Sequence, residues 1–334
     1  MNIAFRSSPM ATASTPEQAF SNVRSRRDAQ QAGATRTIGA ISIDMDTLSD
    51  YARGYGFQSH LAADPVYTHG LVRFLEILAK HDIRATLFVI ARDAMVPAHA
   101  AILRHAIEAG HEIANHTMTH PRRLSALSDS GRRREIVEAH DTLCELAGRR
   151  IVGFRAPCYD ICQKTLRTLE RLDYQYDSSV HPSMIAPVID LAVLIKSRFR
   201  KWDVRPGSYW RLLSPLRPHR IRQQGILELP LSALPYSRLP FYGTWVQSTG
   251  MTVFRKSLSW LRRFSLPLNF HFHAVELVGL NDTGVDPRFA VHPGMKRDVE
   301  RRLADVDEML SAFTVGYELN TLESMALRFE RSLK

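Results

Sequence analysis

A repeated alternation of short apolar runs with amphipathic stretches is the feature that most constrains the fold of this chain. Predicted strands lie at 37–45 (TIGAISIDM), 84–91 (RATLFVIA), 111–115 (HEIAN) and 150–155 (RIVGFR), and predicted helices at 66–83, 97–110 and 130–148. Because short buried strands joined by helices form parallel sheets, this pattern predicts an α/β fold with a parallel sheet, open or closed into a barrel. Functional side chains should then gather at the carboxyl ends of the strands.

The second half of the chain alternates less regularly. It predicts strands at 174–179, 225–234, 266–274 and 313–316, and helices at 164–172, about 252–264, about 295–313 and from Thr321 onward. Residues 183–224 break the pattern, and we interpret this basic, proline-containing stretch as an insertion over one face. Residues 1–36 lack apolar periodicity and predict a mobile N-terminal arm. We therefore expect a single domain over 37–334, preceded by that arm.

The charge balance of the chain raises the question of an anionic partner. Lys and Arg number 44 against 34 Asp and Glu, a net charge of +10. We expect no nucleic-acid binding, because no basic helix carries interleaved aromatic residues. Residues 191–222 do combine basic side chains with Trp202, Tyr209 and Trp210. That mixture suits peripheral contact with an anionic membrane or lipid carrier, and it equally suits a solvated insertion, so both interpretations stay open.

The cellular compartment is predicted from cysteine usage and from the N-terminal sequence. The 3 cysteines are too few for a disulfide framework in a chain of 334 residues, which favours a reducing compartment. The first twenty residues contain no apolar core of a signal peptide, and no later run reaches the roughly 18 apolar residues of a membrane span. We therefore expect a cytoplasmic protein, with peripheral association at the membrane as the open alternative.

The first predicted strand ends in two carboxylates, Asp44 and Asp46. Residues i and i+2 of a strand project to the same side, so both acids should face one space. Two acids at the end of a buried strand are costly unless they have a partner or a function. The alternative is a strand-end turn in which Asp46 caps Leu48 or Ser49, and the sequence leaves both interpretations open.

Two histidines, His116 and His120, follow the predicted strand 111–115. On a helical turn, residues four apart share a face, so both imidazoles would reach one ion. One carboxylate from the first strand would complete a His₂Asp set, which leaves coordination positions open as a catalytic metal requires. The alternative is that two histidines at this spacing are ordinary surface residues, but here they follow a predicted strand and precede Pro121, as a loop at the carboxyl end of a strand would.

Two later strands contribute further polar side chains at the same predicted edge. Arg155 ends the strand 150–155, where a guanidinium can hold a carboxylate ionised beside a metal, or form a purely structural ion pair. His271 and His273 alternate onto one face of the strand 266–274, and Glu276 follows. A histidine at that place can act as a general acid, although a satisfied core histidine is the usual interpretation of either one alone.

Taken together, these motifs resemble the polysaccharide deacetylases, carbohydrate esterase family 4. The resemblance extends from about Thr37 to Leu322. It rests on the order and spacing of Ile43-Asp-Met-Asp46, Arg84-Ala-Thr-Leu-Phe88, His111-Glu-Ile-Ala-Asn-His116-Thr-Met-Thr-His120-Pro121, Gly153-Phe-Arg-Ala-Pro157 and Phe272-His273.

The resemblance implies a distorted (β/α) barrel of about seven strands, similar to a TIM barrel. It implies that Asp46, His116 and His120 hold a divalent metal, usually zinc, with cobalt, manganese or nickel as alternatives. Asp44 would be the general base that activates water, Arg155 would orient Asp44, and His273 would protonate the leaving amine. The implied reaction is hydrolysis of the acetamide of an N-acetylated amino sugar in a glycan, glycan precursor or glycolipid.

The sequence departs from the common family pattern at two places. Met45 separates two acids that are adjacent in most members, which resembles an Asp-x-Asp branch. That branch also implies two alternatives, a deformylase of a lipid-linked formamido sugar and a cyclic-imide or amide hydrolase. A non-catalytic glycan-binding relative is a third alternative. Cys158 stands where the family often has glycine, and we interpret Cys158 and Cys162 as bystander thiols.

Overall fold

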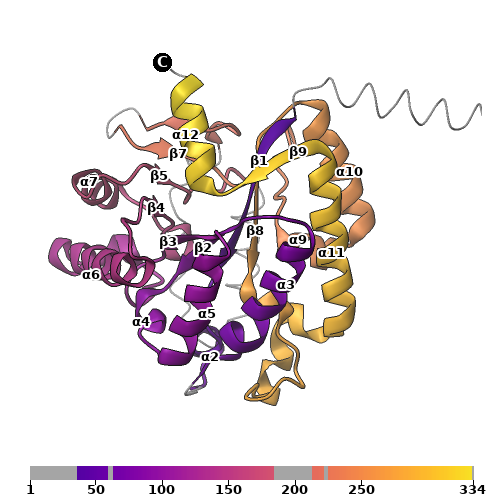
Figure 1. Cartoon of the computed structure of the whole chain (residues 1–334), viewed down its shortest axis with the longest axis horizontal. Helices are drawn as coiled ribbons and strands as arrows, with labels where there is room; N and C mark the ends of the chain where they lie inside the picture. Colours follow the sequence, from indigo (N-terminus) through magenta and orange to yellow (C-terminus); the bar gives the residue numbers. More distant parts are fainter. Residues whose placement is uncertain (1–35, 59–62, 184–212, 222–224, 333–334) are drawn as a thin grey trace, which may run out of the picture. The chain divides into compact units, whose positions relative to one another are not determined.

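The predicted alternation builds one curled sheet of short strands with helices around it (Figure 1). The computed structural model describes residues 36–58, 63–183, 213–221 and 225–332, and the account below concerns the unit Thr37–Lys334. The N-terminal arm predicted for 1–36 and most of the basic segment 191–222 lie outside the described residues. The strands are β1 (Thr37–Asp44), β2 (Thr86–Val89), β3 (Glu112–Asn115), β4 (Gly153–Phe154), β5 (Tyr176–Asp177), β6 (His219–Arg220), β7 (Leu227–Glu228), β8 (Leu268–His273) and β9 (Tyr317–Asn320).

The strand order is β6-β7-β5-β4-β3-β2-β1-β8, and β9 also pairs with β1. Every described pairing is parallel except β6 with β7. The predicted fold class, an α/β distorted barrel, is therefore confirmed, with nine short strands among the described residues where about seven were expected. Since β1 lies between β2 and β8, the first and the last long strands are neighbours although more than 200 positions separate them.

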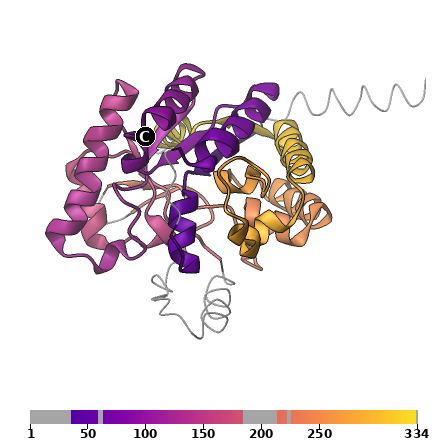
Figure 2. The same ribbon diagram turned by 90° about the horizontal axis from the view of Figure 1, so that it is seen from below.

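Helices surround the outside of the curled sheet, as the view from below shows for α3 and α5, for α6 and α7, and for α10 and α11 (Figure 2). The α-helices are α2 (Leu48–Tyr55), α3 (Val72–Lys80), α4 (Ala91–Ala94), α5 (Pro97–Glu108), α6 (Asp129–Ala147), α7 (Gln163–Arg171), α9 (Gly243–Thr249), α10 (Met251–Arg263), α11 (Val299–Gly316) and α12 (Leu322–Ser332). The predicted stop of α6 at Gly148 is confirmed, because that glycine has φ 62°, the left-handed conformation of a helix C-cap.

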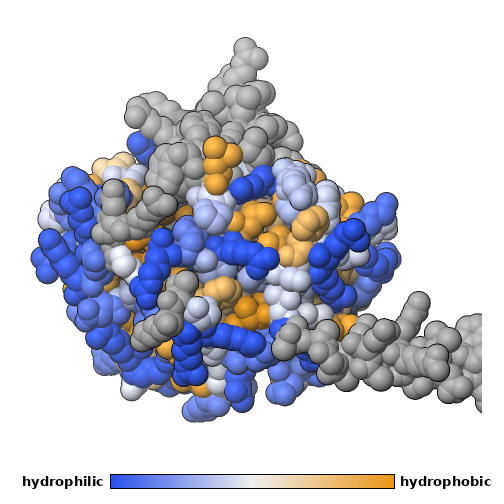
Figure 3. Space-filling view, turned by 90° about the horizontal axis from the view of Figure 1, so that it is seen from above, coloured by the Kyte–Doolittle hydropathy of each residue, from blue (hydrophilic) through white to orange (hydrophobic). Residues whose placement is uncertain are grey.

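The two faces of β1 belong to two different cores. Ile41 and Ile43 point outward into the large core beneath the helices. Ile38 and Ala40 point inward and pack against Leu322 and its neighbours on α12. Helix α12 therefore closes the interior of the sheet at the amino ends of the strands, and that end of the unit presents mainly hydrophilic residues with small hydrophobic patches between them (Figure 3). The inner face towards the carboxyl ends is left for polar side chains.

Some predicted boundaries were wrong. The segment 313–316 is not a strand: α11 continues to Gly316 and the strand β9 begins at Tyr317. The buried residues Val306, Met309, Leu310 and Phe313 of α11 follow helical spacing, so Phe313 belongs to the apolar face of the helix. The predicted helix 66–83 begins with a π-helical turn, Val66–Leu71, before α3. Helices α2 and α9 were not predicted, because each is shorter than the window over which periodicity is recognised.

Candidate active site

The carboxyl ends of the strands surround a cavity of about 370 Å³. Five of the six residues predicted to form the site line it: Asp44, Asp46, His116, His120 and His273. The sixth, Arg155, contacts Asp44 through its guanidinium. The structure thus brings all six predicted residues together from β1, β3, β4 and β8 and the loops that follow them.

Asp46, His116 and His120 form a compact cluster of possible metal ligands. Asp46 Oδ1 lies 3.4 Å from His116 Nε2 and 3.3 Å from His120 Nε2. Tetrahedral zinc, with bonds of about 2.0–2.1 Å, places neighbouring ligand atoms about 3.3 Å apart. Asp46 Oδ1 and His120 Nε2 are buried without a hydrogen-bond partner among the described residues. These spacings and these two orphaned atoms fit a bound divalent cation.

Hydrogen bonding outside the cluster orients one of its histidines. His116 Nδ1 donates to the backbone carbonyl of Arg155 at 2.8 Å, because a carbonyl oxygen only accepts. The Nε2 atom of His116 therefore faces Asp46, which is the orientation found in metal-binding histidines. Burial alone would raise the pKa of Asp46, but His120 and His116 lower it well below its usual range. Asp46 is consequently a carboxylate, as a metal ligand must be.

The backbone that carries His116 and His120 is not the helical turn that we expected. His116 directly follows β3, and Thr117 and His120 adopt left-handed φ values of 69° and 56°. Side-chain bonds hold this loop, since Asn115 Oδ1 accepts from the backbone N–H of Thr117 at 2.7 Å. A β-branched residue in this conformation is costly, by about 1–3 kcal/mol. The loop, and not a helix face, points both imidazoles at Asp46.

The two acids at the end of β1 differ in their positions. Asp44 is the last residue of β1 and lies on its inner face, whereas Asp46 lies beyond the strand. The alternative in which Asp46 caps the next helix is wrong: Thr47 caps α2, and its Oγ1 accepts from the N–H of Asp50. Asp64 Oδ1 accepts from the N–H of Leu48 at 3.2 Å. Asp46 is therefore left to face the cavity.

Arg155 holds Asp44 from a fully buried position. Its Nη1 donates to Asp44 Oδ1, and its Nη2 donates to the hydroxyls of Ser42 and Ser178 at 3.0 Å each. Its guanidinium carbon also lies 3.9 Å from the centre of the Phe88 ring. Its Nε donates to the backbone carbonyl of Ser178 at 3.0 Å. Two hydroxyls, this carbonyl and the Phe88 ring fix the guanidinium, so Asp44 has a rigid cationic partner.

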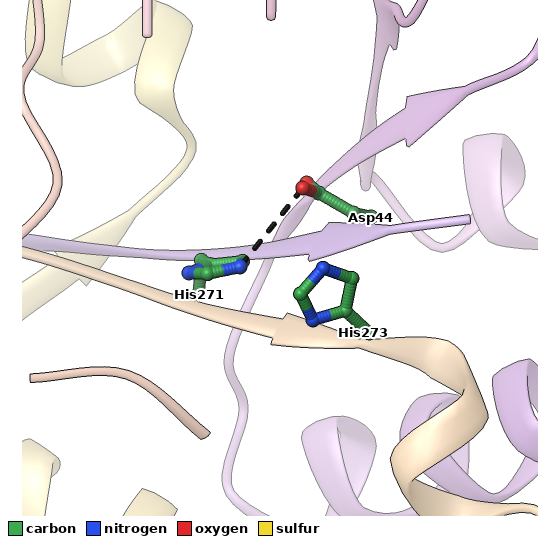
Figure 4. Close-up of side chains that lie close together, drawn as sticks. All are labelled: Asp44, His271 and His273. Carbon is green, nitrogen blue, oxygen red and sulfur yellow. Dashed lines mark ion pairs between the residues drawn. The ribbon is translucent and has the colours of Figure 1, made fainter. Parts of the chain in front are cut away.

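His271 and His273 face Asp44 from the neighbouring strand β8 (Figure 4). The register pairs Asp44 with His273 and Ser42 with His271, which explains how residues far apart in sequence meet. His271 Nε2 lies 4.0 Å from Asp44 Oδ2 and 2.9 Å from the Tyr159 hydroxyl. Burial, and then His273 and Arg155, lower the pKa of His271 well below its usual value, so it is neutral.

His273 has the opposite electrostatic environment. Glu276 Oε1 lies 3.6 Å from His273 Nδ1. Burial would lower the pKa of His273, but Glu276 and the charges of Asp46 and Asp44 raise it to about 9. Glu276 is itself buried and accepts hydrogen bonds from Thr244 Oγ1 at 2.6 Å and Gln247 Nε2 at 3.3 Å. A protonated imidazole held in this way has one ring nitrogen left for a ligand in the cavity.

Sequence reasoning assigned no role to several residues of this site. Tyr159 and Tyr242 line the cavity, and the Tyr242 ring stacks on His271 with centroids 5.1 Å apart. The one sequence signal for Tyr159 is its position two residues after the Gly153–Pro157 motif. Cys158 has φ 50° and is exposed at the cavity wall, and Tyr159 has φ 57°. The left-handed turn at Cys158 is a conformation that favours glycine.

Comparison with known families gives a match over a segment that includes His116, His120 and Arg155. Residues 59–176 match the family model described as polysaccharide deacetylase, which confirms the resemblance read from the motifs. The chain is 41% identical over 80 residues to a chitooligosaccharide deacetylase of Sinorhizobium fredii (strain NBRC 101917 / NGR234), covering 23% of this chain and 33% of that protein. A chitooligosaccharide deacetylase of Rhizobium leguminosarum bv. trifolii is 37% identical over 75 residues, covering 22% of this chain and 34% of that protein. The chain thus matches about a third of the length of these two relatives.

Solved structures share the fold over most of the chain. A protein from Mycobacterium smegmatis assigned as a polysaccharide deacetylase has a TM-score of 0.59 at 19% identity, covering 90% of this chain and 92% of its own. Puue allantoinase has a TM-score of 0.53 at 15% identity, covering 86% and 87%. At these identities the similarity concerns the fold alone. Among the described residues, no helix is both long enough and apolar enough to cross a membrane.

Proposed function

Since residues 59–176 match the polysaccharide deacetylase family model, we propose that this chain is a metal-dependent N-deacetylase. Its substrate would be the acetamide of an N-acetylated amino sugar in a glycan, glycan precursor or glycolipid. The observation that carries the proposal is that one cavity holds the Asp46–His116–His120 cluster together with Asp44 and His273. The names of the curated relatives, chitooligosaccharide deacetylases, support the same reaction.

Asp46, His116 and His120 would hold the metal. We favour zinc, because zinc commonly binds two imidazoles and one carboxylate at this spacing. When bound, a divalent metal supplies Lewis-acid polarisation of the acyl carbonyl and makes water more acidic. The remaining steps belong to side chains of the chain itself.

Asp44 is the proposed general base. It lies on the wall of the cavity, and Arg155 and the inward face of β1 hold its carboxylate in one orientation. As water attacks the acyl carbon, Asp44 accepts the proton that the water loses. A positioned base of this kind contributes roughly 10²–10⁴-fold to the rate.

His273 is the proposed general acid. It faces Asp44 across the pairing of β1 with β8, and it is protonated at neutral pH because Glu276 and the nearby acids raise its pKa to about 9. When the C–N bond breaks, the imidazolium gives its proton to the leaving nitrogen, so the sugar departs as a neutral amine and acetate is released. Glu276 acts through His273 and is therefore a positioning residue.

The test compares metal content and acetate release in matched variants. Protein stripped with a chelator and reloaded with zinc or cobalt should release acetate from N-acetylated sugars. His116→Ala should lose both metal and activity, whereas His105→Ala, the same change on the exposed side of α5, should keep both. A His116→Ala protein with full metal content and full activity would refute the site. Measuring formate beside acetate on a substrate panel separates deacetylation from deformylation.

A further inference from the structure

Two aromatic side chains on the cavity wall carry polar atoms that the proposed reaction does not use. Tyr51 on α2 and His292, which directly follows the 3₁₀ turn Pro287–Val291, both line the cavity. Their rings pack edge to face, with centroids 5.1 Å apart and ring planes at 86°. Two segments that are far apart in the sequence therefore contribute one pair of side chains to the wall.

A backbone hydrogen bond fixes which nitrogen of His292 carries the proton. Nδ1 accepts from the N–H of Gly294 at 3.2 Å, so this nitrogen has a lone pair. Burial, and then the charges of His273 and Arg302, lower the pKa of His292 to about 4, so the ring is neutral at pH 7. The proton of a neutral imidazole then lies on Nε2. Nε2 is not fully buried and has no hydrogen-bond partner among the described residues, so its N–H is left for a ligand in the cavity.

The hydroxyl of Tyr51 is a second donor of the same kind. Burial, and then the charges of Asp46 and Glu276, raise the pKa of Tyr51 well above its usual value, so the phenol keeps its proton. Within the described part of the chain this hydroxyl has no hydrogen-bond partner, and it is not fully buried. The helix holds the residue in place, because the N–H of Tyr51 donates to the carbonyl of the N-cap residue Thr47 at 3.2 Å.

The charged neighbours of this pair locate it beside the leaving group. Asp46 and Glu276 act electrostatically on Tyr51, and His273 acts on His292. Asp46 belongs to the proposed metal cluster and His273 is the proposed general acid, so the pair lies close to the point where the C–N bond breaks. The amino sugar is the part of the substrate that departs there. Since both donors are neutral, they suit an uncharged oxygen of that sugar.

From these observations we propose that Tyr51 Oη and His292 Nε2 donate hydrogen bonds to hydroxyl oxygens of the amino sugar. The inference rests on the proposed function and deepens it, because it assigns the residues that distinguish a sugar from a simple amide. A site that hydrogen-bonds a substrate hydroxyl rejects an analogue without that hydroxyl, because its donors are then left unpaired. If the two rings only packed α2 against the turn, their replacement would affect all amide substrates alike.

The experiment compares a hydroxylated and a hydroxyl-free amide on the zinc-loaded protein. The probes are N-acetylglucosamine and N-cyclohexylacetamide, which has a six-membered ring without hydroxyls. In Tyr51→Phe, the ratio of kcat/KM for the sugar to kcat/KM for the cyclohexyl amide should fall about tenfold, as expected for one lost hydrogen bond. His292→Asn should lower the same ratio, because asparagine can accept from Gly294 through Oδ1 but has no donor at the Nε2 position. Tyr67→Phe is the matched control, because it removes a hydroxyl that is buried without a partner away from the cavity wall, and it should leave the ratio unchanged.

Calorimetry tests the inference without catalysis. Glucosamine and cyclohexylamine are both amines with no acyl group to lose, and only glucosamine has hydroxyls. Tyr51→Phe and His292→Asn should weaken the binding of glucosamine more than the binding of cyclohexylamine. This selective loss supports the inference even if the protein releases no acetate, a result that would count against the proposed function alone. Equal changes for both members of a probe pair, or no change in either, would overturn the inference.

Discussion

Replacing Arg155 by methionine should destabilise the protein mainly by leaving the Asp44 carboxylate buried without its cation. The two side chains are 0% and 4% exposed. Breaking a buried ion pair by removing one partner typically costs about 3–5 kcal/mol. For a unit of this size, each kcal/mol lowers the melting temperature by about 2 °C, so we expect a fall of about 6–10 °C. Since the proposed base loses its partner, kcat should fall about 100-fold.

A double-mutant cycle separates the unpaired charge from lost packing. Asp44→Asn removes the carboxylate. The double variant should therefore lose less free energy of unfolding than the sum of the losses in Arg155→Met and Asp44→Asn. Arg302→Met is the matched control, because Arg302 is equally buried but donates to the backbone carbonyls of Arg297, Glu276 and Val278. The loss in free energy of unfolding that Arg302→Met causes should be additive with the loss that Asp44→Asn causes.

The assay is denaturant unfolding of the chelator-treated protein, which keeps metal binding from contributing to the measured stability. Two results would refute the reasoning. One is a loss of less than 1 kcal/mol in Arg155→Met. The other is strict additivity of Arg155→Met with Asp44→Asn.

Three other outcomes are expected. Glu276→Gln should move the alkaline limb of the kcat profile, expected near pH 9 from the raised pKa of His273, to lower pH, and an unmoved limb would count against Glu276 as a positioning residue. Burial raises the pKa of Glu112 from 4.5 to about 7, so the folded state keeps a proton that the unfolded state releases. The free energy of unfolding should therefore fall by about 3 kcal/mol as pH rises through this range. Glu112→Gln should remove that fall. The check compares the unfolding midpoints of the wild type and of Glu112→Gln at pH 5 and pH 8, and an equal change with pH in both proteins would contradict the prediction. Thr47→Ala should cost about 1 kcal/mol as a lost N-cap and weaken zinc binding at the adjacent Asp46, which calorimetric titration measures; unchanged affinity would mean that the cap does not position the ligand.

Local sequence was sufficient for most of the elements and for the identity of the site residues. Strand β1 is an apolar run in which alternate residues face different cores, and α6 carries its stop signal at Gly148, so both follow from period and capping alone. The acids and histidines were visible because ionisable side chains at the ends of buried strands are costly unless they have a partner or a function. Since parallel strands end at one edge, their common location also followed from the pattern.

The tertiary structure decided which of these side chains touch. The pairing of β1 with β8 places His273 opposite Asp44, and no local signal encodes the pairing of strands more than 200 positions apart. Left-handed residues in the loop 116–120 aim both imidazoles at Asp46, a conformation that periodicity does not predict for threonine or histidine. Sequence determines short-range backbone preference and burial pattern, whereas the chemistry of this cavity depends on distances between segments that only the folded chain brings together.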